Sequence, residues 1–446
     1  MKSLSAVGLF WCIHILSTSA IAGITVEGDL SRRADLGFSV SASDNRLAIK
    51  ELEEGSPAAR TSLIAGDIIV SVNGKTYTHN FEGRDLLRRL NGGETVSIVV
   101  QRAGSELQFE FVPEETPFVD TENAHTIYDV VETKDGSRLR TALSHRQDVK
   151  GPMPLVVLIQ WVSCGIVTDD LQPELKTVMD ALPVAILRVE RSSDGDSEGP
   201  ACHELDYNTE IRHYTSAILD IVGNRIVDRS RVYLYGSSLG STIAPLVAQE
   251  LKRKNLLVAG LMVQGGGGLT HVERMINFDR INLERRNDRE FRSIHEEMMP
   301  RILFQTEYLI KRRHPDEIAR DGDAMARVRD DILGLGKFNH YGRPFAWHQQ
   351  AASHDFLEAW LDVAAPTLVV FAEFDQFEMS YGHRVIVDVL NREHPGIADY
   401  VELPNINHFN DFHTDVDQAY FRADGIPAID LFASEMVKWL RKGLAH

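Results

Sequence analysis

The chain has few cysteines, no excess of positive charge and no internal repeats. Only three of its 446 residues are cysteine, and its 47 Lys and Arg residues are outnumbered by 65 Asp and Glu residues. A surface that binds nucleic acid needs a basic face, so a formal charge of −18 argues against such a partner. Heptads and low-complexity tracts are also absent, and coiled-coil or solenoid architectures are therefore not expected.

Long apolar runs are absent except near the N-terminus. Lys2 supplies a positive charge, Val7 to Leu16 is apolar, and Ala20-Ile21-Ala22 fits a small-residue cleavage site before Gly23. This order predicts a secretory signal peptide over residues 1–22. The alternative is a membrane anchor, but the run is too short to span a bilayer comfortably. We therefore expect a periplasmic or secreted protein with no stable membrane span after cleavage.

Cleavage at that site would remove Cys12 and leave Cys164 and Cys202. An even pair of cysteines in an oxidising compartment favours a disulfide. Two free buried thiols are the alternative.

The sequence does contain a sharply defined motif, Gly236-Ser237-Ser238-Leu239-Gly240. The run Val232 to Tyr235 before it is β-branched and aromatic, as in a buried strand, and the small residues after it can begin a helix. At ordinary Gly and Ser frequencies, roughly 0.15 such pentapeptides would occur by chance in a chain of this length. Strand, turn and helix around G-x-S-x-G are typical of a nucleophile elbow, which holds Ser238 at its tip. The alternative is a Gly/Ser turn without chemistry.

The composition, 43% hydrophobic and 25% charged, is typical of a soluble globular protein with two or three domains. Residues 24–115 read as a compact β-rich module. Strands are predicted over Leu47–Leu52, Ile68–Val72, Glu94–Arg102 and Leu107–Val112, and a helix over Arg84–Leu90. The polar stretch Glu114-Glu115-Thr116-Pro117 indicates a linker, for which we expect the bounds 116–124.

This first module resembles a bacterial, protease-associated PDZ domain. The resemblance rests on Asp35-Leu36-Gly37-Phe38, on SPAARTSLIAGDIIVSVNG from Ser56 to Gly74, and on the helix near Leu86 and Leu87. It implies that Leu36, Gly37 and Phe38 form a loop that binds the carboxylate of a peptide C-terminus, which adds as a strand. A PDZ fold used only for packing or dimerisation is the alternative.

Residues 125–446 show strands alternating with helices, which predicts a mainly parallel sheet with helices on both faces. Thr126–Glu132 and Arg138–Leu143 read as a hairpin around Asp135-Gly136. Further strands are expected at Pro154–Gln160, Val184–Val189, Leu257–Val263, Pro366–Phe371 and, as the last, Tyr400–Leu403. Helices are expected at Thr209–Val222 and Pro427–Leu440. Residues 270–360 carry helical patterns without strand signals.

With the elbow, this order resembles the α/β-hydrolase fold, and 270–360 corresponds to a helical cap. The fold's chain order of Ser, acid and His matches Ser238, Asp375 in the turn after Pro366–Phe371, and His408 in the loop Leu403-Pro404-Asn405-Ile406-Asn407-His408. The resemblance implies that Ser238 attacks a carbonyl, His408 takes its proton and Asp375 orients the imidazole.

Each of these assignments has a competitor in the sequence. Glu373 is an alternative acid and His413 an alternative base. His408, Asp411 and His413 could instead form a metal site, but no zinc-protease motif accompanies them. We therefore expect neither metal nor cofactor.

The resemblance places the oxyanion hole at the backbone N–H groups of Leu239 and Val162, with Trp161 as the alternative to Val162. Cys164 lies in this same loop, and Cys202 follows the next strand. A disulfide between them would fix the loop and stabilise the fold by roughly 3 kcal/mol. The turn Asp194-Gly195-Asp196-Ser197 lacks calcium-loop spacing and reads as structural.

The sequence thus predicts an exported serine hydrolase with a PDZ-like module, acting on a small ester or amide or on a peptide. A PDZ-guided peptidase acting on chain ends is one alternative. A binding protein that uses the hydrolase fold only as a scaffold is another.

Overall fold

The computed structural model describes residues 19–21, 23–43, 45–285, 290–421 and 424–445. Apart from residues 19–21, the predicted signal peptide lies outside the described residues. No helix in these ranges is long and apolar enough to cross a membrane.

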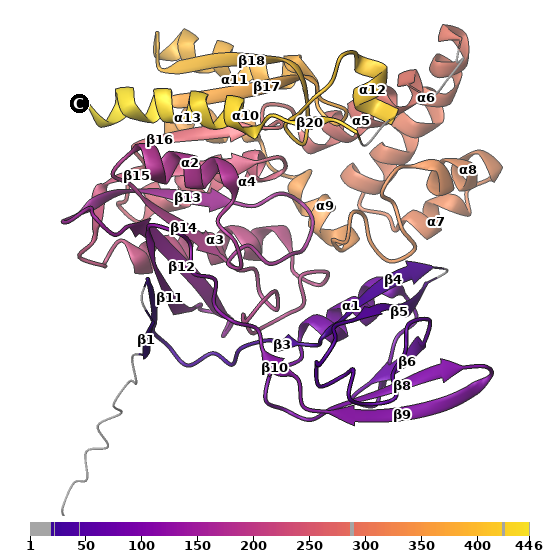
Figure 1. Cartoon of the computed structure of the whole chain (residues 1–446). Helices are drawn as coiled ribbons and strands as arrows, with labels where there is room; N and C mark the ends of the chain where they lie inside the picture. The colour runs from indigo at the N-terminus through magenta and orange to yellow at the C-terminus, as the bar shows by residue number, and fades with distance from the viewer. Residues whose placement is uncertain (1–18, 22, 44, 286–289, 422–423, 446) are drawn as a thin grey trace, which may run out of the picture.

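The chain forms a small β-rich module and a larger α/β module (Figure 1). In the small module the strands β4 (Phe38–Ser43), β5 (Arg46–Leu52), β6 (Ile68–Val72), β8 (Val96–Arg102) and β9 (Ser105–Phe111) form one sheet in that order. The short β7 (Lys75–Thr76) pairs with β6. The helix α1 (Asn80–Arg88) packs Leu87 into the core of this sheet.

The large module contains a mixed sheet whose central strands are parallel. In spatial order they are β14 (Ala185–Val189), β13 (Met153–Ile159), β15 (Val227–Ser237), β16 (Gly260–Gln264), β17 (Thr367–Phe374) and β18 (Ala398–Asn407). The predicted hairpin is present as β11 (Ala124–Glu132) and β12 (Arg138–Arg146), and β12 runs antiparallel to β14.

Alternation along the central strands explains how helices cover both faces of this sheet. In β13, Leu155 and Val157 pack on one face, and Val156 packs on the other. The first face is covered by α3 (Tyr207–Ile221), α4 (Gly240–Arg253), α10 (Phe356–Val363) and α11 (Ser380–Glu393). The second is covered by α2 (Pro173–Ala181) and α13 (Ile429–Leu444).

The segment after β16 is helical, as predicted. It comprises α5 (His271–Arg285), α6 (Phe291–Gln305), the π-helical turn Thr306–Ile310, α7 (Pro315–Ala319), α8 (Asp323–Asp331) and α9 (Phe345–Ala351). These helices share a separate apolar core that includes Phe304, Tyr308 and Ile318.

Two features of the sheet differ from the sequence prediction. Tyr400–Leu403 lies within β18 but is not the last strand, because β19 (Asp411–Phe412) and β20 (Ile426–Pro427) follow it. These two-residue strands are too short to show a period. In addition, the sequence predicts that Ile24–Val26 belongs to the first module. In the structure these residues form β2, which pairs in parallel with β11 of the large sheet and antiparallel with β1 (Ser19–Ile21).

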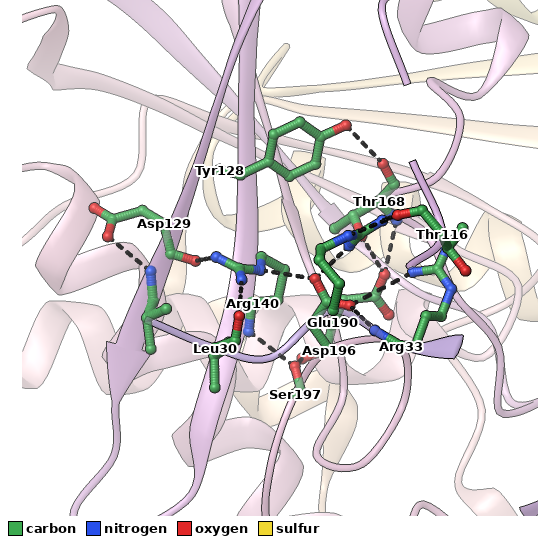
Figure 2. A network of polar contacts seen from close by, with 12 residues as sticks. Leu30, Arg33, Thr116, Tyr128, Asp129, Arg140, Thr168, Glu190, Asp196 and Ser197 are labelled. Carbon is green, nitrogen blue, oxygen red and sulfur yellow. Dashed lines mark hydrogen bonds and ion pairs between the residues drawn. The ribbon is translucent and has the colours of Figure 1, made fainter. Parts of the chain in front are cut away.

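The small module is consequently attached to the large one through both of its ends. The segment that follows β2 ends in the short strand β3 (Ala34–Asp35). This strand pairs with β10 (Glu114–Glu115). Just before β3, the buried Arg32 and Arg33 both pair with the buried Asp196 of the large module. Asp196 also accepts a 3.2 Å hydrogen bond from Arg140, and Figure 2 shows Arg33, Arg140 and Asp196 in this network.

Side chains of α1 and of the residue before it also contact the large module. His79 contacts Phe338 at a tilted angle with ring centres 4.3 Å apart, and Phe81 contacts His203 edge-on at 5.6 Å. The helix therefore lies on the side of the small module that faces its neighbour (Figure 1).

Candidate active site

Ser238 lies in the tight turn between β15 and α4, with a left-handed φ of 51°. The flanking glycines are required by close backbone contacts. A Cβ on Gly236 would lie 2.7 Å from the carbonyl oxygen of Gly240, and one on Gly240 would lie 2.2 Å from that of Ile159 in β13. The sequence thus adopts the strained strand–turn–helix geometry that exposes a serine at a helix N-terminus.

Two residues that are distant in sequence meet Ser238 at the carboxyl edge of the parallel sheet. His408 follows β18, and its Nε2 lies 2.9 Å from the Ser238 Oγ. Asp375 follows β17, and its Oδ2 lies 2.7 Å from the His408 Nδ1. With Nδ1 protonated and donating to Asp375, Nε2 accepts the hydroxyl proton of Ser238.

Backbone groups hold the carboxylate of Asp375 in place. Its Oδ1 accepts hydrogen bonds from the N–H groups of Phe377 and Glu378, at 2.8 and 2.9 Å. Burial alone would raise the pKa of Asp375, but the charge and hydrogen bond of His408 outweigh it and lower that pKa. Burial likewise acts to lower the pKa of His408, and Asp375 more than reverses this, so that pKa is raised. The two groups therefore favour an ionised acid beside a more basic imidazole.

The competing residues are engaged elsewhere. The Glu373 carboxylate accepts a 2.8 Å hydrogen bond from the N–H of Asn405, and the His413 Nε2 lies 2.9 Å from the Asn407 amide. Neither residue contacts Ser238 within the described part of the chain.

Val162 and Leu239 both line the cavity that contains Ser238, as does Trp161. Within the described residues, the N–H groups of Val162 and Leu239 donate none of the loop and turn hydrogen bonds. The carbonyl oxygens on either side of Val162 are held from behind by the buried Arg191, which donates to Trp161 and, at 2.8 Å, to Ser163. The carbonyl groups of Trp161 and Ser163 are therefore held in place, while the N–H groups of Val162 and Leu239 donate to none of these loop and turn partners.

The predicted disulfide between Cys164 and Cys202 is present and ties this loop to the segment after β14. A cluster of buried charged residues lies beneath this disulfide. Glu210 of α3 pairs with Arg191 at 2.5 Å and with Arg343, and it accepts a 3.0 Å hydrogen bond from the Trp347 indole. Sequence reasoning missed this cluster, because its members come from three segments that carry no common motif.

The cavity next to Ser238 has a volume of about 590 Å³ and is walled largely by apolar side chains. The apolar residues that line it include Trp161, Leu239, Met275, Phe278, Phe377 and Phe409. Two charged residues that the sequence did not single out, Arg274 of α5 and Glu378, also line it and form a buried ion pair. No sequence signal distinguished them from the many other charged residues in the predicted cap and loops.

The loop Leu36-Gly37-Phe38 lies at the start of β4 in the small module. Gly37 has a left-handed φ of 63°, and a Cβ there would lie 2.2 Å from that of Ser56, so a side chain would clash. The Gly37 N–H donates to the Asp35 carboxylate at 3.0 Å, while Leu36 and Phe38 pack partly buried against the core. A peptide carboxylate at this loop would compete with Asp35 for that N–H.

Family models match two parts of the chain. A PDZ domain matches residues 34–111, and the alpha/beta hydrolase family matches residues 160–423. A probable periplasmic serine endoprotease of the DegP-like kind from Bartonella henselae is 25% identical over 182 residues, 38% of this chain and 33% of that protein. The chain therefore matches about a third of the length of this curated relative.

Two solved structures are among those that the chain matches at low sequence identity. Est1E from Butyrivibrio proteoclasticus is 13% identical, with a TM-score of 0.43 over 72% of this chain and 99% of that one. EstE1, a carboxylesterase cloned from a metagenomic library, is 14% identical, with a TM-score of 0.42 over 72% of this chain and 90% of that one.

Proposed function

The chain belongs to the alpha/beta hydrolase family, and on this premise we propose that it is an exported serine hydrolase that cleaves an ester or amide bond through an acyl-enzyme. The observation that carries the proposal is the hydrogen-bonded series from Ser238 through His408 to Asp375, with steps of 2.9 and 2.7 Å. A serine hydroxyl is a weak nucleophile, and this series supplies the base that activates it and the acid that orients the base.

In the proposed mechanism, the Ser238 Oγ attacks the substrate carbonyl carbon while His408 takes its proton. The imidazolium that forms is stabilised by the Asp375 carboxylate. The negative charge on the carbonyl oxygen is stabilised by the N–H groups of Leu239 and Val162, aided by the N-terminus of α4. His408 then protonates the leaving group, and the acyl-enzyme is hydrolysed by a water molecule that His408 deprotonates in turn.

The apolar wall of the cavity favours an ester with an apolar acyl chain as the substrate. A second candidate, a serine peptidase, is supported by the PDZ domain and by the likeness to a serine endoprotease. The disulfide and the periplasmic location named for that relative support an extracytoplasmic location. In this proposal the PDZ domain binds a peptide C-terminus through Leu36, Gly37 and Phe38.

A fluorophosphonate probe tests the nucleophile directly. We expect wild-type protein to be labelled and Ser238→Ala to be unlabelled. The control is Ser230→Ala, an exposed serine of the same strand, which should label as the wild type does. Labelling that persists in Ser238→Ala would remove Ser238 from this role, and a wild type that does not react would favour the scaffold alternative. Comparing p-nitrophenyl esters with aminoacyl anilides then separates an esterase from a peptidase.

A further inference from the structure

Arg274 is an unusual member of an otherwise largely apolar cavity. It is the only Arg or Lys among the described residues that line the cavity, and 5% of its surface is exposed. Its Nη2 donates to the Gly265 carbonyl at 3.1 Å, and its guanidinium pairs with Glu378. Its Nη1 is buried and has no hydrogen-bond partner within the described residues.

The contact with Gly265 places this guanidinium close to the reacting atoms. Gly265 follows β16 directly, and a Cβ on it would lie 2.9 Å from the Ser238 Cα and 2.9 Å from the His408 Cε1. Because Arg274 bonds to the carbonyl of this same residue, one glycine separates its guanidinium from the nucleophile and the base.

A second polar group of the cavity is also unpaired. The hydroxyl of Tyr341 is buried without a hydrogen-bond partner in the described part of the chain, and its ring lies 5.9 Å from that of Phe278 on α5. Among the described residues that line the cavity, three carry a buried side-chain atom without a partner: the donors Arg274 Nη1 and Tyr341 OH, and the acceptor Asn410 Oδ1. A buried donor without a partner is costly in a folded protein, so the two donors favour a ligand that accepts hydrogen bonds.

The carboxyl group of Glu378 neutralises the positive charge of Arg274 only in part. Burial, opposed by Arg274, raises the pKa of Glu378 to about 7, which disfavours its charged form. The other acidic residue lining the cavity, Glu174, has a pKa that burial also raises. The cavity therefore favours a negatively charged group brought in by the substrate.

We propose that the substrate carries a carboxylate in addition to the bond that is cleaved, and that Arg274 binds this carboxylate as the specificity-determining residue, with Tyr341 as a second donor. The inference rests on the proposed function, since it names the substrate class of the same site. A guanidinium pairs with a carboxylate through parallel hydrogen bonds, which gives geometric selectivity as well as affinity.

The test compares ester pairs that differ only in this charge. Mono-p-nitrophenyl adipate, with the carboxylate on the acyl side, is compared with p-nitrophenyl 6-methylheptanoate, its neutral isostere. For the leaving-group side, 4-butanoyloxybenzoate is compared with 4-butanoyloxybenzamide. We expect wild-type protein to favour the carboxylate member of one pair by roughly ten- to hundredfold in kcat/KM, mainly through KM. The pair that shows the preference identifies the side on which the carboxylate lies.

Three variants separate binding from a structural role. Arg274→Gln should abolish the preference, so that kcat/KM falls at least about tenfold more for the carboxylate ester than for its neutral partner. Arg274→Lys should retain part of the preference, because it keeps the charge but loses the paired donors. Glu378→Gln should increase the preference, because it removes the competing carboxylate. Equal losses for charged and neutral esters in Arg274→Gln, or a wild type without preference in either pair, would overturn the proposal.

A binding measurement distinguishes failure of this inference from failure of the proposed function. Calorimetric titration of Ser238→Ala with the two carboxylate esters and their neutral partners requires no turnover. Tighter binding of one carboxylate ester, lost in the Ser238→Ala/Arg274→Gln double variant, would support the inference even if no ester were cleaved. Cleavage of the neutral esters that depends on Ser238, combined with equal binding of charged and neutral esters, would leave the hydrolase proposal standing and reject the carboxylate site.

Discussion

Single residues decide the protonation state of the site. His408 must be neutral to accept the Ser238 proton, so kcat/KM should fall as the pH falls through its pKa. Burial acts to lower the pKa of His408, but Asp375 raises it above the ordinary 6.5. We therefore expect an acidic limb in the pH profile of kcat/KM with an apparent pKa above 6.5, measured with a neutral ester.

Asp375→Asn provides the matched control for this limb. It removes the charge that raises the pKa of His408, so the limb should move to lower pH. The plateau should also fall by about 10⁴, as expected when the orienting carboxylate of such a triad is lost. A limb that stays in place would show that it belongs to another group, such as Glu378.

Replacing Gly265 by alanine tests whether the active site can accommodate one additional methyl group. Gly265→Ala would place a Cβ 2.9 Å from both Ser238 and His408 at a φ of +91°. Gly66→Ala is the matched control, because its φ is +93° and it has nothing within 4 Å. Both variants should lose about 1–2 kcal/mol of stability from backbone strain. Only Gly265→Ala should lose activity, by at least about tenfold in kcat, and equal activities in the two variants would contradict this.

Among the structural elements, the loop after β13 depends most on its supports. The cluster around Glu210 holds its carbonyls, since Arg191 bridges from Glu210 to Trp161 and Ser163. Glu210→Gln would leave two buried arginines without their carboxylate and should destabilise the fold by about 3–5 kcal/mol. Urea unfolding would measure this loss. The exposed Glu198→Gln, whose carboxylate pairs with the partly exposed Arg138, should cost less than about 1 kcal/mol.

Acid should remove the contribution of Glu210 in the wild type. Burial acts to raise the pKa of Glu210, but Arg191 and Arg343 lower it below its ordinary 4.5. A carboxyl group with a depressed pKa in the folded state contributes stability above its unfolded pKa, and this is lost as the pH falls through the folded value. The stability difference between wild type and Glu210→Gln should therefore shrink below pH 4.5.

The disulfide supports the same loop from its other end. Replacing Cys164 and Cys202 together by alanine should lower the free energy of unfolding by about 2–4 kcal/mol, because the 38-residue separation closes a long loop in the unfolded chain. We also expect kcat to fall more than KM rises, since the Val162 N–H would be less well positioned. Unchanged kcat in a stably folded double variant would show that the loop holds its shape without the bridge.

At the scale of the whole molecule, the small module is fastened through Asp196. This buried carboxylate pairs with Arg32 and Arg33 of the segment entering the small module and with Arg140 of the large sheet. Figure 2 shows Arg33, Arg140 and Asp196. Asp196→Asn should leave three buried cations less compensated and lower stability by about 3–5 kcal/mol. Limited proteolysis should then cut faster within residues 27–33 and 116–120. Cleavage at the wild-type rate would show that the β2–β11 and β3–β10 pairings suffice.

Local sequence patterns were enough to identify several parts of this protein. The strand and glycines around Ser238, the turn after β17 that carries Asp375 and the loop with His408 were recognised from short segments, and the structure brings all three into hydrogen-bonding distance. The disulfide and the PDZ-like and hydrolase-like organisation were also predicted. The turn at Ser238 depends on glycines that are visible in the sequence, whereas Asp375 and His408 were recognised by their places after predicted strands.

Other features depend on contacts between segments that share no local pattern, and only the tertiary structure decided them. The pairing of β2 with β11, the Glu210 cluster and the Arg274–Glu378 pair each join residues about a hundred or more positions apart. A charged residue in sequence resembles any solvated residue, because its burial and its partner are set by how whole elements pack. The sequence therefore determined which groups could perform the proposed chemistry, and the packing of the cap and loops decided which charge faces the substrate.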